Sequence, residues 1–254
     1  MNQKDRIALV TGAAKRIGRV IAMSLAKRGC HIVLHYNSSV GSAFATAEEL
    51  KSYGVKVLPI QADLRRPEQI EAMIEQAVTH FGGLDILVNS AASFVRADLQ
   101  SMTLDVWNEI LAVNLTAPML CIKYAAPVLL RQESGVVINI CDLYSELPTP
   151  PMLAHGVAKA GLLNLTRALA LELAPRVRVN AVIPGVVLPP DDASAEYLAR
   201  TADKNLIKQW GNPDQVAQAV LFLIENDFMV GEALHVDGGE SLAWRLRHVI
   251  RDPA

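Results

Sequence analysis

The stretch "RIALVTGAAKRIGR", residues 6–19, decides the fold. Its first half is an apolar, β-branched run that is typical of a buried strand, and it leads directly into a glycine turn and a helical pattern. Gly12 can turn tightly, and Gly18 allows close packing at the helix start. The amides there can face a pyrophosphate, helped by the helix dipole. The segment therefore indicates a dinucleotide-binding turn; a glycine-rich turn without a ligand is the alternative.

Strand-like runs alternate with helical stretches along the whole chain. Near-continuous apolar strands indicate a sheet that is covered on both faces, and the alternation indicates parallel crossover units. The predicted fold class is α/β: one doubly wound Rossmann-type domain over residues 1–254, with a seven-stranded parallel sheet. The expected strands are 6–11, 31–36, 55–60, 84–89, 135–140, 177–182 and 233–238, and the expected helices lie near 17–29, 41–53, 67–81, 103–131, 152–174 and 213–225.

The longest irregular segment is residues 184–212, where a cluster of Pro and Asp interrupts the alternating pattern. In an open α/β sheet, ligands bind beyond the carboxyl ends of the strands. A long segment that leaves such a strand end predicts a lid over the substrate.

Composition narrows the possible partners. The 254 residues are 51% hydrophobic, and 24 basic against 26 acidic residues leave a net charge of -2. This balance gives no reason to expect nucleic acid or an anionic membrane as a partner. The chain also lacks a signal-peptide pattern and an apolar run approaching the roughly 18–20 residues of a membrane span. The three cysteines and the histidines show no metal-ligand spacing, so we expect a cytoplasmic protein without a metal.

The end of the second strand, "HYNSS" at 35–39, bears on the choice of cofactor. Proteins that select NAD usually place Asp or Glu there, and this segment has no acid. Lys15 and Arg16 in the glycine turn can contact an added phosphate, and Ser38 and Ser39 offer hydroxyl donors. The sequence predicts NADP(H); the alternative is that Lys15 and Arg16 are solvated surface charges.

Six landmarks together resemble the short-chain dehydrogenase/reductase family over nearly the whole chain. They are "TGAAKRIG" (11–18), "ADL" (62–64), "NSAA" (89–92), "LAVNL" (111–115) with Asn114, "PG" (184–185) and "VDGG" (236–239). The resemblance implies that Asp63 bonds the adenine base. The predicted cofactor-binding residues are Gly12, Lys15, Arg16, Ile17, Gly18, Tyr36, Asn37, Ser38, Ser39, Asp63, Leu64, Asn89, Ser90, Ala91, Lys159, Pro184 and Gly185.

A narrower resemblance is to the pteridine reductases, on Arg16, "LHYNSS" (34–39), Phe94 and Asp142. It implies a dihydropterin or a similar flat heterocycle such as dihydrofolate, bound by Arg16, Phe94, Asp142 and His155. An aromatic ring can form one wall of a slot for such a ligand, and a carboxylate can bind its ring nitrogens or relay a proton. Ordinary core packing is the alternative for Phe94, and a helix cap or a surface acid is the alternative for Asp142.

The segment "HGVAK", residues 155–159, departs from the family. The family acid is a tyrosine four residues before a lysine, and this spacing places both on one helix face. Lys159 matches the lysine, which binds the cofactor ribose, whereas counting 13 residues on from Asp142 reaches His155. The nearest tyrosine, Tyr144, precedes the helix. Histidine therefore stands at the tyrosine position.

Three interpretations of His155 stay open. The histidine can act as the acid, because imidazole carries a proton near neutral pH and Asp142 can stabilise the imidazolium. Asp142 or a water can instead supply the proton while His155 orients the substrate. The third interpretation is an NADP-binding protein with little reductase activity. The predicted catalytic set is Asn114, Asp142, His155 and Lys159, with Asn114 shaping the neighbouring helix and holding a water.

The resulting prediction is an NADPH-dependent reductase of a dihydropterin-like small molecule. A reductase of another carbonyl or imine and a catalytically weak family member are the alternatives. The resemblance also implies a homo-oligomer, a tetramer or a dimer, built through the helices near 103–131 and 152–174. The C-terminal segment 243–254 can lie across a neighbouring subunit or form a surface helix or tail.

Overall fold

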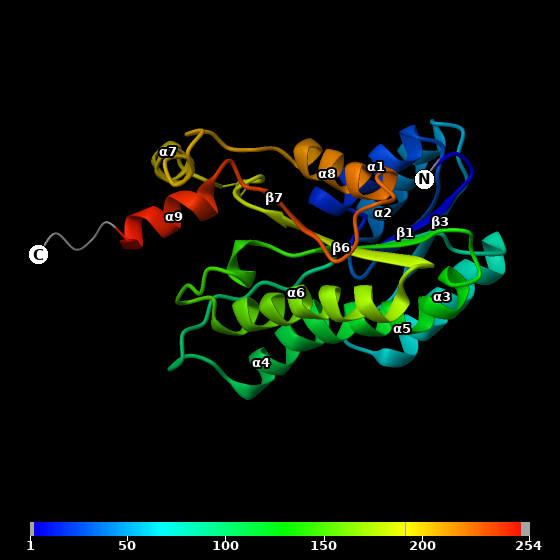
Figure 1. Ribbon diagram of the computed structural model, residues 1–254, viewed down its shortest axis with the longest axis horizontal. Coiled ribbons are helices and arrows are strands. Elements are labelled where there is room, and N and C mark those ends of the chain that lie inside the picture. The colour runs from blue at the N-terminus through cyan, green and yellow to red at the C-terminus, as the bar shows by residue number, and fades with distance from the viewer. Residues whose placement is uncertain (1–2, 191, 250–254) are drawn as a thin grey trace, which may run out of the picture.

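The computed structural model describes residues 3–190 and 192–249, and it shows a central sheet with helices on both faces (Figure 1). The sheet order is β3-β2-β1-β4-β5-β6-β7, and all neighbouring strands are parallel. The strands are β1 (Ile7–Val10), β2 (His31–Tyr36), β3 (Val57–Gln61), β4 (Ile86–Asn89), β5 (Gly135–Ile140), β6 (Val177–Pro184) and β7 (Ala233–Val236). The predicted doubly wound, seven-stranded parallel fold is confirmed.

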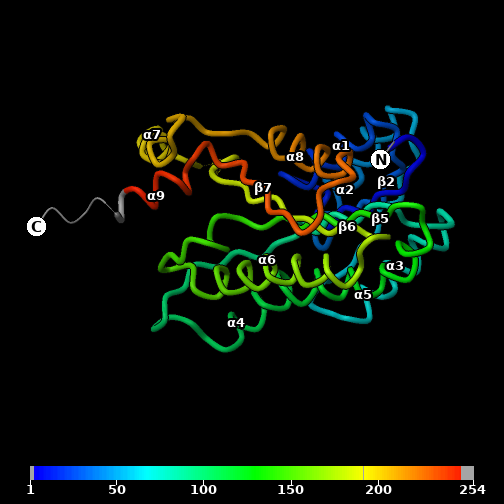
Figure 2. Tube along the Cα trace, in the orientation of Figure 1, coloured from blue at the N-terminus to red at the C-terminus, as the bar shows by residue number. Residues whose placement is uncertain are grey.

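The helices follow the strands in the predicted alternation. They are α1 (Arg16–Lys27), α2 (Val40–Lys51), α3 (Pro67–Phe81), α4 (Leu104–Leu111), α5 (Ala117–Leu129), α6 (Leu153–Leu173), α7 (Ala195–Ala202), α8 (Pro213–Glu225) and α9 (Glu240–Val249), with a π-helical segment η1 (Ala112–Thr116) and a 3₁₀ turn η2 (Leu143–Ser145). Helices α1, α2 and α8 cover one face of the sheet, and α3, α5 and α6 cover the other (Figure 2).

The strands are apolar throughout because each of their faces enters a different core. In β1, Ala8 and Val10 belong to the cluster that includes α1 and α8, whereas Leu9 belongs to the cluster that includes α3 and α5. All three side chains are fully buried. Burial of one such leucine stabilises the fold by roughly 1.5–3 kcal/mol. The two cores hold β1 and β4 side by side at the centre, where the strand order reverses.

The helix expected near 103–131 is divided in the structure. The π-helical segment Ala112–Thr116 separates α4 from α5. Such bulges often occur at functional sites. Here the fully buried side chain of Asn114 bonds the backbone of Ser93, so a tertiary contact accompanies the change in the helix.

The combined helical run Leu104–Leu129 is long and apolar enough to cross a membrane. In this fold it contacts α3, β4 and β5, and Cys121 and Leu129 are fully buried there. The run therefore belongs to the layer of helices that packs on the same face of the sheet as α3.

The segment 184–212 is not entirely irregular, because it contains α7. Ser194 caps this helix by accepting a hydrogen bond from the Tyr197 amide, and Glu196 lies in its first turn. The cap and the acid are ordinary start signals for a helix, although the nearby prolines obscure them in the sequence. At the C-terminus, α9 ends at Val249, so residues 250–254 of the segment considered for a neighbour contact lie outside the described residues.

Candidate active site

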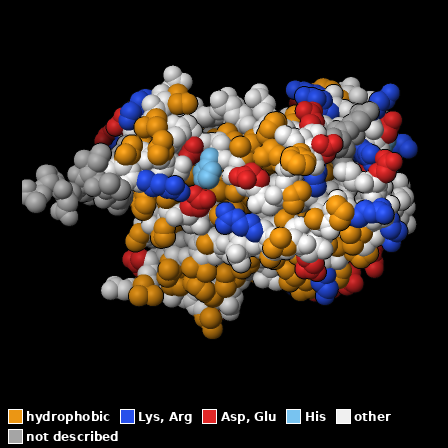
Figure 3. All heavy atoms as spheres, in the orientation of Figure 1, with side chains coloured by type: hydrophobic (Ala, Val, Ile, Leu, Met, Phe, Trp, Pro, Cys, Tyr) orange, Lys and Arg blue, Asp and Glu red, His pale blue; other side chains and the backbone are white. Residues whose placement is uncertain are grey.

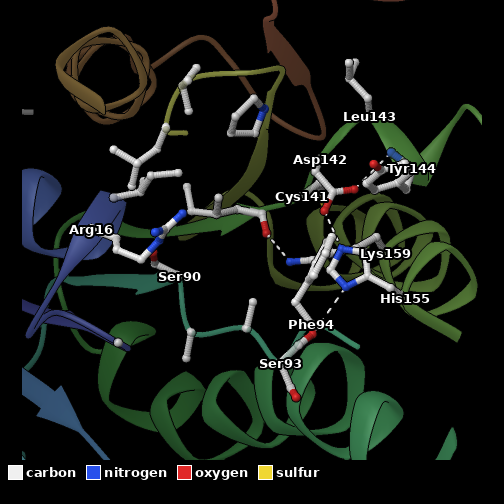
Figure 4. A pocket seen from close by; sticks show the side chains of 18 of the residues that line it. Arg16, Ser90, Ser93, Phe94, Cys141, Asp142, Leu143, Tyr144, His155 and Lys159 are labelled. Atoms are coloured by element: carbon white, nitrogen blue, oxygen red, sulfur yellow. Dashed lines mark hydrogen bonds and ion pairs between the residues drawn. The ribbon is translucent and has the colours of Figure 1, made fainter. Parts of the chain in front are cut away.

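A cavity of about 1170 Å³ opens at the carboxyl ends of the central strands (Figure 4). Its lining comes from the turn after β1, the loops after β4, β5 and β6, and helices α6 and α9. Pockets that hold one small ligand measure about 300–1000 Å³. The cavity is large enough for a dinucleotide together with a second molecule.

The glycine turn has the shape of a phosphate cradle. Gly12 has a φ of 68°, and a Cβ there would lie 3.0 Å from the Ala91 Cα. A Cβ on Gly18 would lie only 2.4 Å from the Gly12 carbonyl oxygen. Side chains at either position would therefore displace backbone. The turn brings the start of α1 to the cavity wall, where amides and the helix dipole suit a pyrophosphate.

Arg16 occupies a strained position within this turn. Its φ is 54°, in the left-handed region that favours glycine. Its side chain reaches from the turn into the cavity, with Ser90 nearby (Figure 4). Strain of this kind persists at sites where function requires the residue.

Most of the predicted cofactor residues line the cavity. They are Gly12, Lys15, Arg16, Ile17, Gly18, Asn37, Asp63, Leu64, Ser90, Ala91, Lys159, Pro184 and Gly185. The structure does not bring Tyr36, Ser38, Ser39 or Asn89 to the lining formed by the described residues. Tyr36 is instead buried near Phe44, and Asn89 is buried against Asn139. Ser38 and Ser39 lie beyond the end of β2.

Asp63, expected to bond adenine, already has a partner. Its two carboxylate oxygens accept hydrogen bonds from Arg65, with contacts of 2.7–3.1 Å. These bonds lower the pKa of Asp63, so the carboxylate stays ionised. Arg65 also lines the cavity and was not identified from the sequence.

One end of the cavity contains a histidine–aspartate pair. His155 Nε2 lies 2.5 Å from Asp142 Oδ2, and His155 Nδ1 lies 3.3 Å from the Ser93 carbonyl oxygen (Figure 4). The His155 side chain is only 2% exposed, whereas that of Asp142 is 25% exposed. Asp142 is therefore the member of the pair that presents an open surface to the cavity.

The hydrogen-bond partners limit where the protons of this pair can lie. A carbonyl oxygen only accepts, so the bond to Ser93 places a hydrogen on His155 Nδ1. The contact between Nε2 and Asp142 then needs a further proton, on either the imidazole or the carboxyl. Both contacts are hydrogen bonds at the same time only when the pair holds one proton more than a neutral imidazole beside a carboxylate.

Two aromatic rings close over the histidine. The Phe94 ring centroid lies 4.8 Å from that of His155, and the Tyr144 centroid lies 5.9 Å from it, both edge to face. Phe94 is 53% exposed, so core packing does not explain its position. Burial, followed by the nearby Asp142 charge, raises the pKa of Tyr144, so its phenol is a weaker acid than usual.

Asp142 combines the cap and the site contact. Its Oδ1 accepts a hydrogen bond from the Tyr144 amide at the start of η2, while Oδ2 meets His155. The capping interpretation is therefore correct for one oxygen. The cap fixes the carboxylate, so the second oxygen is held against the imidazole.

Lys159 and Asn114 each bond a backbone group of a segment next to the histidine–aspartate pair. Lys159 lies one helical turn after His155 on α6, lines the cavity, and donates a hydrogen bond of 2.7 Å to the Ile140 carbonyl. Asn114 does not line the cavity. Its amide binds both the N–H and the carbonyl of Ser93, at 3.2 and 2.7 Å. Asn114 thus holds the carbonyl that His155 contacts.

Several lining residues were missed by sequence reasoning. They are His35, Arg65, Ser93, Arg96, Glu109, Tyr197, Lys204, Trp210, Glu240 and Trp244. The aromatic ones could have been noticed in the segments 184–212 and 243–254, because the chain is only 5% aromatic. His35 begins the segment 35–39 at the end of β2, and the remaining residues belong to no local pattern.

Metal and thiol chemistry have little support in the described part of the chain. Within residues 3–190 and 192–249, no group of three or more His, Cys, Asp or Glu side chains could hold a metal ion. Burial raises the pKa of Cys30, Cys121 and Cys141 to about 12, so these thiols stay protonated.

The doubly wound sheet, the glycine cradle and the lysine-bearing helix at one strand edge define a nicotinamide-dependent oxidoreductase. A family model described as enoyl-(acyl carrier protein) reductase matches residues 12–241. The chain belongs to the short-chain dehydrogenase/reductase family, and it is an NADP(H)-dependent enzyme of that family.

Relatives and solved structures agree with this assignment. The chain is 35% identical to the 3-oxoacyl-[acyl-carrier-protein] reductase FabG of Staphylococcus aureus over 91% of this chain and 96% of the relative. It is 33% identical to glucose 1-dehydrogenase 2 of Bacillus subtilis, over 93% and 95%. Blue fluorescent protein from a metagenomic library, in complex with NADPH, superposes with a TM-score of 0.89 at 30% identity, over 94% and 99% of the two chains. Acetoin dehydrogenase YohF from Salmonella typhimurium superposes with a TM-score of 0.87 at 31% identity, over 94% of this chain and 96% of that chain.

Proposed function

We propose that this enzyme uses NADPH to reduce a dihydropterin-like substrate, a reduced pteridine or dihydrofolate. The observation that carries the proposal is the position of Asp142, whose carboxyl group lies at the cavity wall beside the exposed Phe94 ring. A carboxyl group can pair with the ring nitrogens of an amidine-like heterocycle. The pteridine assignment is narrower than what the named relatives support, so it depends on this pairing.

The aromatic lining favours a flat substrate. Five aromatic side chains line the cavity, namely Phe94, Tyr144, Tyr197, Trp210 and Trp244. Aromatic faces stack on planar heterocycles and gain about 0.5–1.5 kcal/mol beyond the burial of area. Tyr197 and Trp210 come from the segment 184–212, which we propose acts as the lid over the substrate.

We assign the proton delivery to Asp142 rather than to His155. Both ring nitrogens of His155 are already bonded, and the ring is buried. The carboxyl group of Asp142 is the more exposed end of the pair, so it can reach a substrate nitrogen. His155 holds the carboxyl and supplies the second proton position. General acid catalysis of this kind raises the reaction rate by about 10²–10⁴-fold.

The reduction is balanced as one hydride and one proton. When bound, NADPH would supply the hydride that adds to the carbon of a substrate C=N bond. The adjacent nitrogen takes the proton from the Asp142–His155 pair, which leaves an ionised carboxylate beside an imidazole that keeps its Nδ1 hydrogen. Solvent then restores the missing proton. An imine nitrogen accepts a proton more readily than a ketone oxygen does, which suits a carboxyl donor in place of a phenol.

The remaining predicted residues bind and orient. Lys159, fixed by the Ile140 carbonyl, would hold the cofactor ribose. Lys15 and Arg16 would contact the additional phosphate of NADP(H), and Arg16 would also reach the substrate edge. Asn114 would act through Ser93, because both of its amide atoms are bonded to that backbone.

The named relatives favour a second candidate, the reduction of a carbonyl such as a 3-oxoacyl thioester. The discriminating feature is again the Asp142–His155 donor: a carbonyl oxygen accepts a proton less readily than an imine nitrogen does, so this donor suits the first candidate better. A third outcome is a protein that binds NADPH without turnover.

One experiment separates these candidates. NADPH oxidation is followed with dihydrobiopterin, dihydromonapterin, dihydrofolate and acetoacetyl-coenzyme A, and NADPH binding is measured by fluorescence. We expect turnover with at least one of the three pterin-type compounds. Turnover with acetoacetyl-coenzyme A alone would establish the carbonyl candidate. NADPH binding without turnover of any compound would identify a catalytically weak member.

We also propose that the enzyme is a homo-oligomer, a dimer or a tetramer. Large apolar side chains are exposed on the helices of one face, including Leu104, Val157 and Leu171, and Figure 3 shows hydrophobic side chains gathered over α4. Burial of these side chains against a second copy would be favourable. The mass in light scattering tests this proposal, and a monomer would contradict it. The cytoplasmic location stays a prediction.

A further inference from the structure

We propose that His35 is a positioning residue for the adenosine half of NADP(H), because it joins two loops that border the cofactor cavity. His35 lies near the end of β2, lines the cavity and is 2% exposed. The inference depends on NADP(H) binding, which the similar NADPH-bound structure and the relatives support, and it is independent of the proposed pterin substrate.

The His35 ring connects the glycine turn to the loop after β3. Its Nδ1 accepts a hydrogen bond of 3.0 Å from the Gly12 amide. Its Nε2 lies 3.0 Å from the Ala62 carbonyl oxygen. Ala62 directly precedes Asp63 and Leu64, which line the cavity. The ring is therefore a bridge of fixed length between the two loops.

The bonding partners define one tautomer. A backbone amide only donates, so Nδ1 carries no hydrogen, and a carbonyl only accepts, so Nε2 carries one. The ring is neutral, and neither nitrogen can take a further proton without losing a bond. Burial lowers the pKa of His35, which keeps the ring in this neutral form.

Backbone contacts add to the same bridge. The Ala13 amide donates to the His35 carbonyl at 2.9 Å, and the Ala62 amide donates to the Tyr36 carbonyl at 3.0 Å. Gly12 itself is packed against Ala91, so the turn has little freedom on its other side. The Nδ1 bond therefore sets the orientation of the Gly12 peptide, which directs the turn toward the cofactor.

Three substitutions separate the two bonds. In His35→Asn, the side-chain oxygen can replace the Nδ1 acceptor. In His35→Gln, the side-chain amide can replace the Nε2 donor but not the acceptor. His35→Leu removes both. His31→Leu is the matched control, because His31 lies on the same strand and accepts a backbone hydrogen bond from Lys56 at its other end.

The measurement is the dissociation constant of NADPH, of adenosine 2′,5′-bisphosphate and of reduced nicotinamide mononucleotide, each on protein shown to be folded. We expect about tenfold weaker binding of NADPH and the bisphosphate in His35→Leu and His35→Gln, with less than about threefold change in His35→Asn and His31→Leu. Binding of the mononucleotide should stay unchanged, and kcat at saturating NADPH should fall less than about twofold in His35→Gln.

Two results would overturn the assignment. One is wild-type affinity for the bisphosphate in folded His35→Gln, which would show that the Gly12 bond has no effect on the cofactor. The other is equal weakening of all three ligands by His35→Asn and His35→Gln, which is the pattern of general destabilisation. If His35→Leu fails to fold, the Asn and Gln variants still decide the question.

Discussion

His155 Nε2 lies 2.5 Å from Asp142 Oδ2, so a histidine on α6 contacts the carboxyl group that follows β5. The imidazole is buried and the carboxyl is the more exposed partner. This geometry supports our proposal that the strand-end carboxyl, rather than the helix residue, donates the proton.

Replacement of Asp142 tests this donor directly. Asp142→Asn keeps the shape of the side chain but cannot deliver an acidic proton, so we expect kcat to fall by about 10²-fold or more. NADPH affinity should change little, because the group does not hold the cofactor. The control is Asp98→Asn, an exposed acid on the loop after β4 that bonds Ser101. Equal activity of Asp142→Asn and the wild type would remove Asp142 from the mechanism.

Replacement of His155 tests the supporting role of the imidazole. His155→Phe preserves a ring against Phe94 and Tyr144 but leaves Asp142 without its partner. We expect a loss in kcat of about tenfold to a hundredfold, smaller than that of Asp142→Asn. His155→Tyr should also lose activity. A large gain in His155→Tyr would instead indicate a decayed tyrosine site.

The glycine cradle predicts a sharp contrast between two glycines. Gly18→Ala places a Cβ 2.4 Å from the Gly12 carbonyl oxygen, so the turn must shift. NADPH binding should therefore weaken by about tenfold or more. Gly41→Ala is the control, because its Cβ meets nothing within 4 Å in α2. That substitution should stabilise the protein by about 0.5–1 kcal/mol, as measured by urea unfolding. Tight NADPH binding by Gly18→Ala would contradict the cradle.

Replacement of Arg16 by glycine should change stability and cofactor binding in opposite directions. Arg16→Gly relieves a left-handed conformation, so the free energy of unfolding should rise by about 1 kcal/mol. NADPH affinity should fall, and the preference for NADPH over NADH should decrease, because a phosphate contact is lost. Urea unfolding and fluorescence titration measure the two effects. An unchanged cofactor preference would place the phosphate elsewhere.

His35 predicts an acid limit to stability. Its pKa in the folded protein is lowered from the ordinary value of 6.5 by burial, so the unfolded chain takes up a proton first as the pH falls. The free energy of unfolding should therefore be at its plateau above about pH 6.5 and decrease below it. Urea midpoints between about pH 5 and pH 8 measure this slope, and His35→Asn should reduce it. A slope unchanged by His35→Asn would assign the effect to other groups.

Much of the fold could be predicted because its causes are local. The strand His31–Tyr36 and the helix Pro67–Phe81 follow from apolar periodicity and a proline at the helix start, and their bounds match the expected ranges. The break at Ala112–Thr116 could not be predicted from local patterns, because it accompanies a contact between Asn114 and Ser93, which lies on another segment. Local patterns also left α7 unnoticed, because prolines precede its Ser194 cap.

By itself, the sequence determined the doubly wound sheet, the glycine turn and the place of His155 one helical turn before Lys159, because periodicity and spacing act within a few residues. Only the tertiary structure decided what His155 touches, since Ser93 is 62 positions away in the chain. The same holds for the bridge that His35 forms between Gly12 and Ala62. Hydrogen-bond partners over such separations depend on how the strands pair. No local pattern encodes the donor–acceptor distances of about 3 Å on which proton transfer and cofactor binding depend.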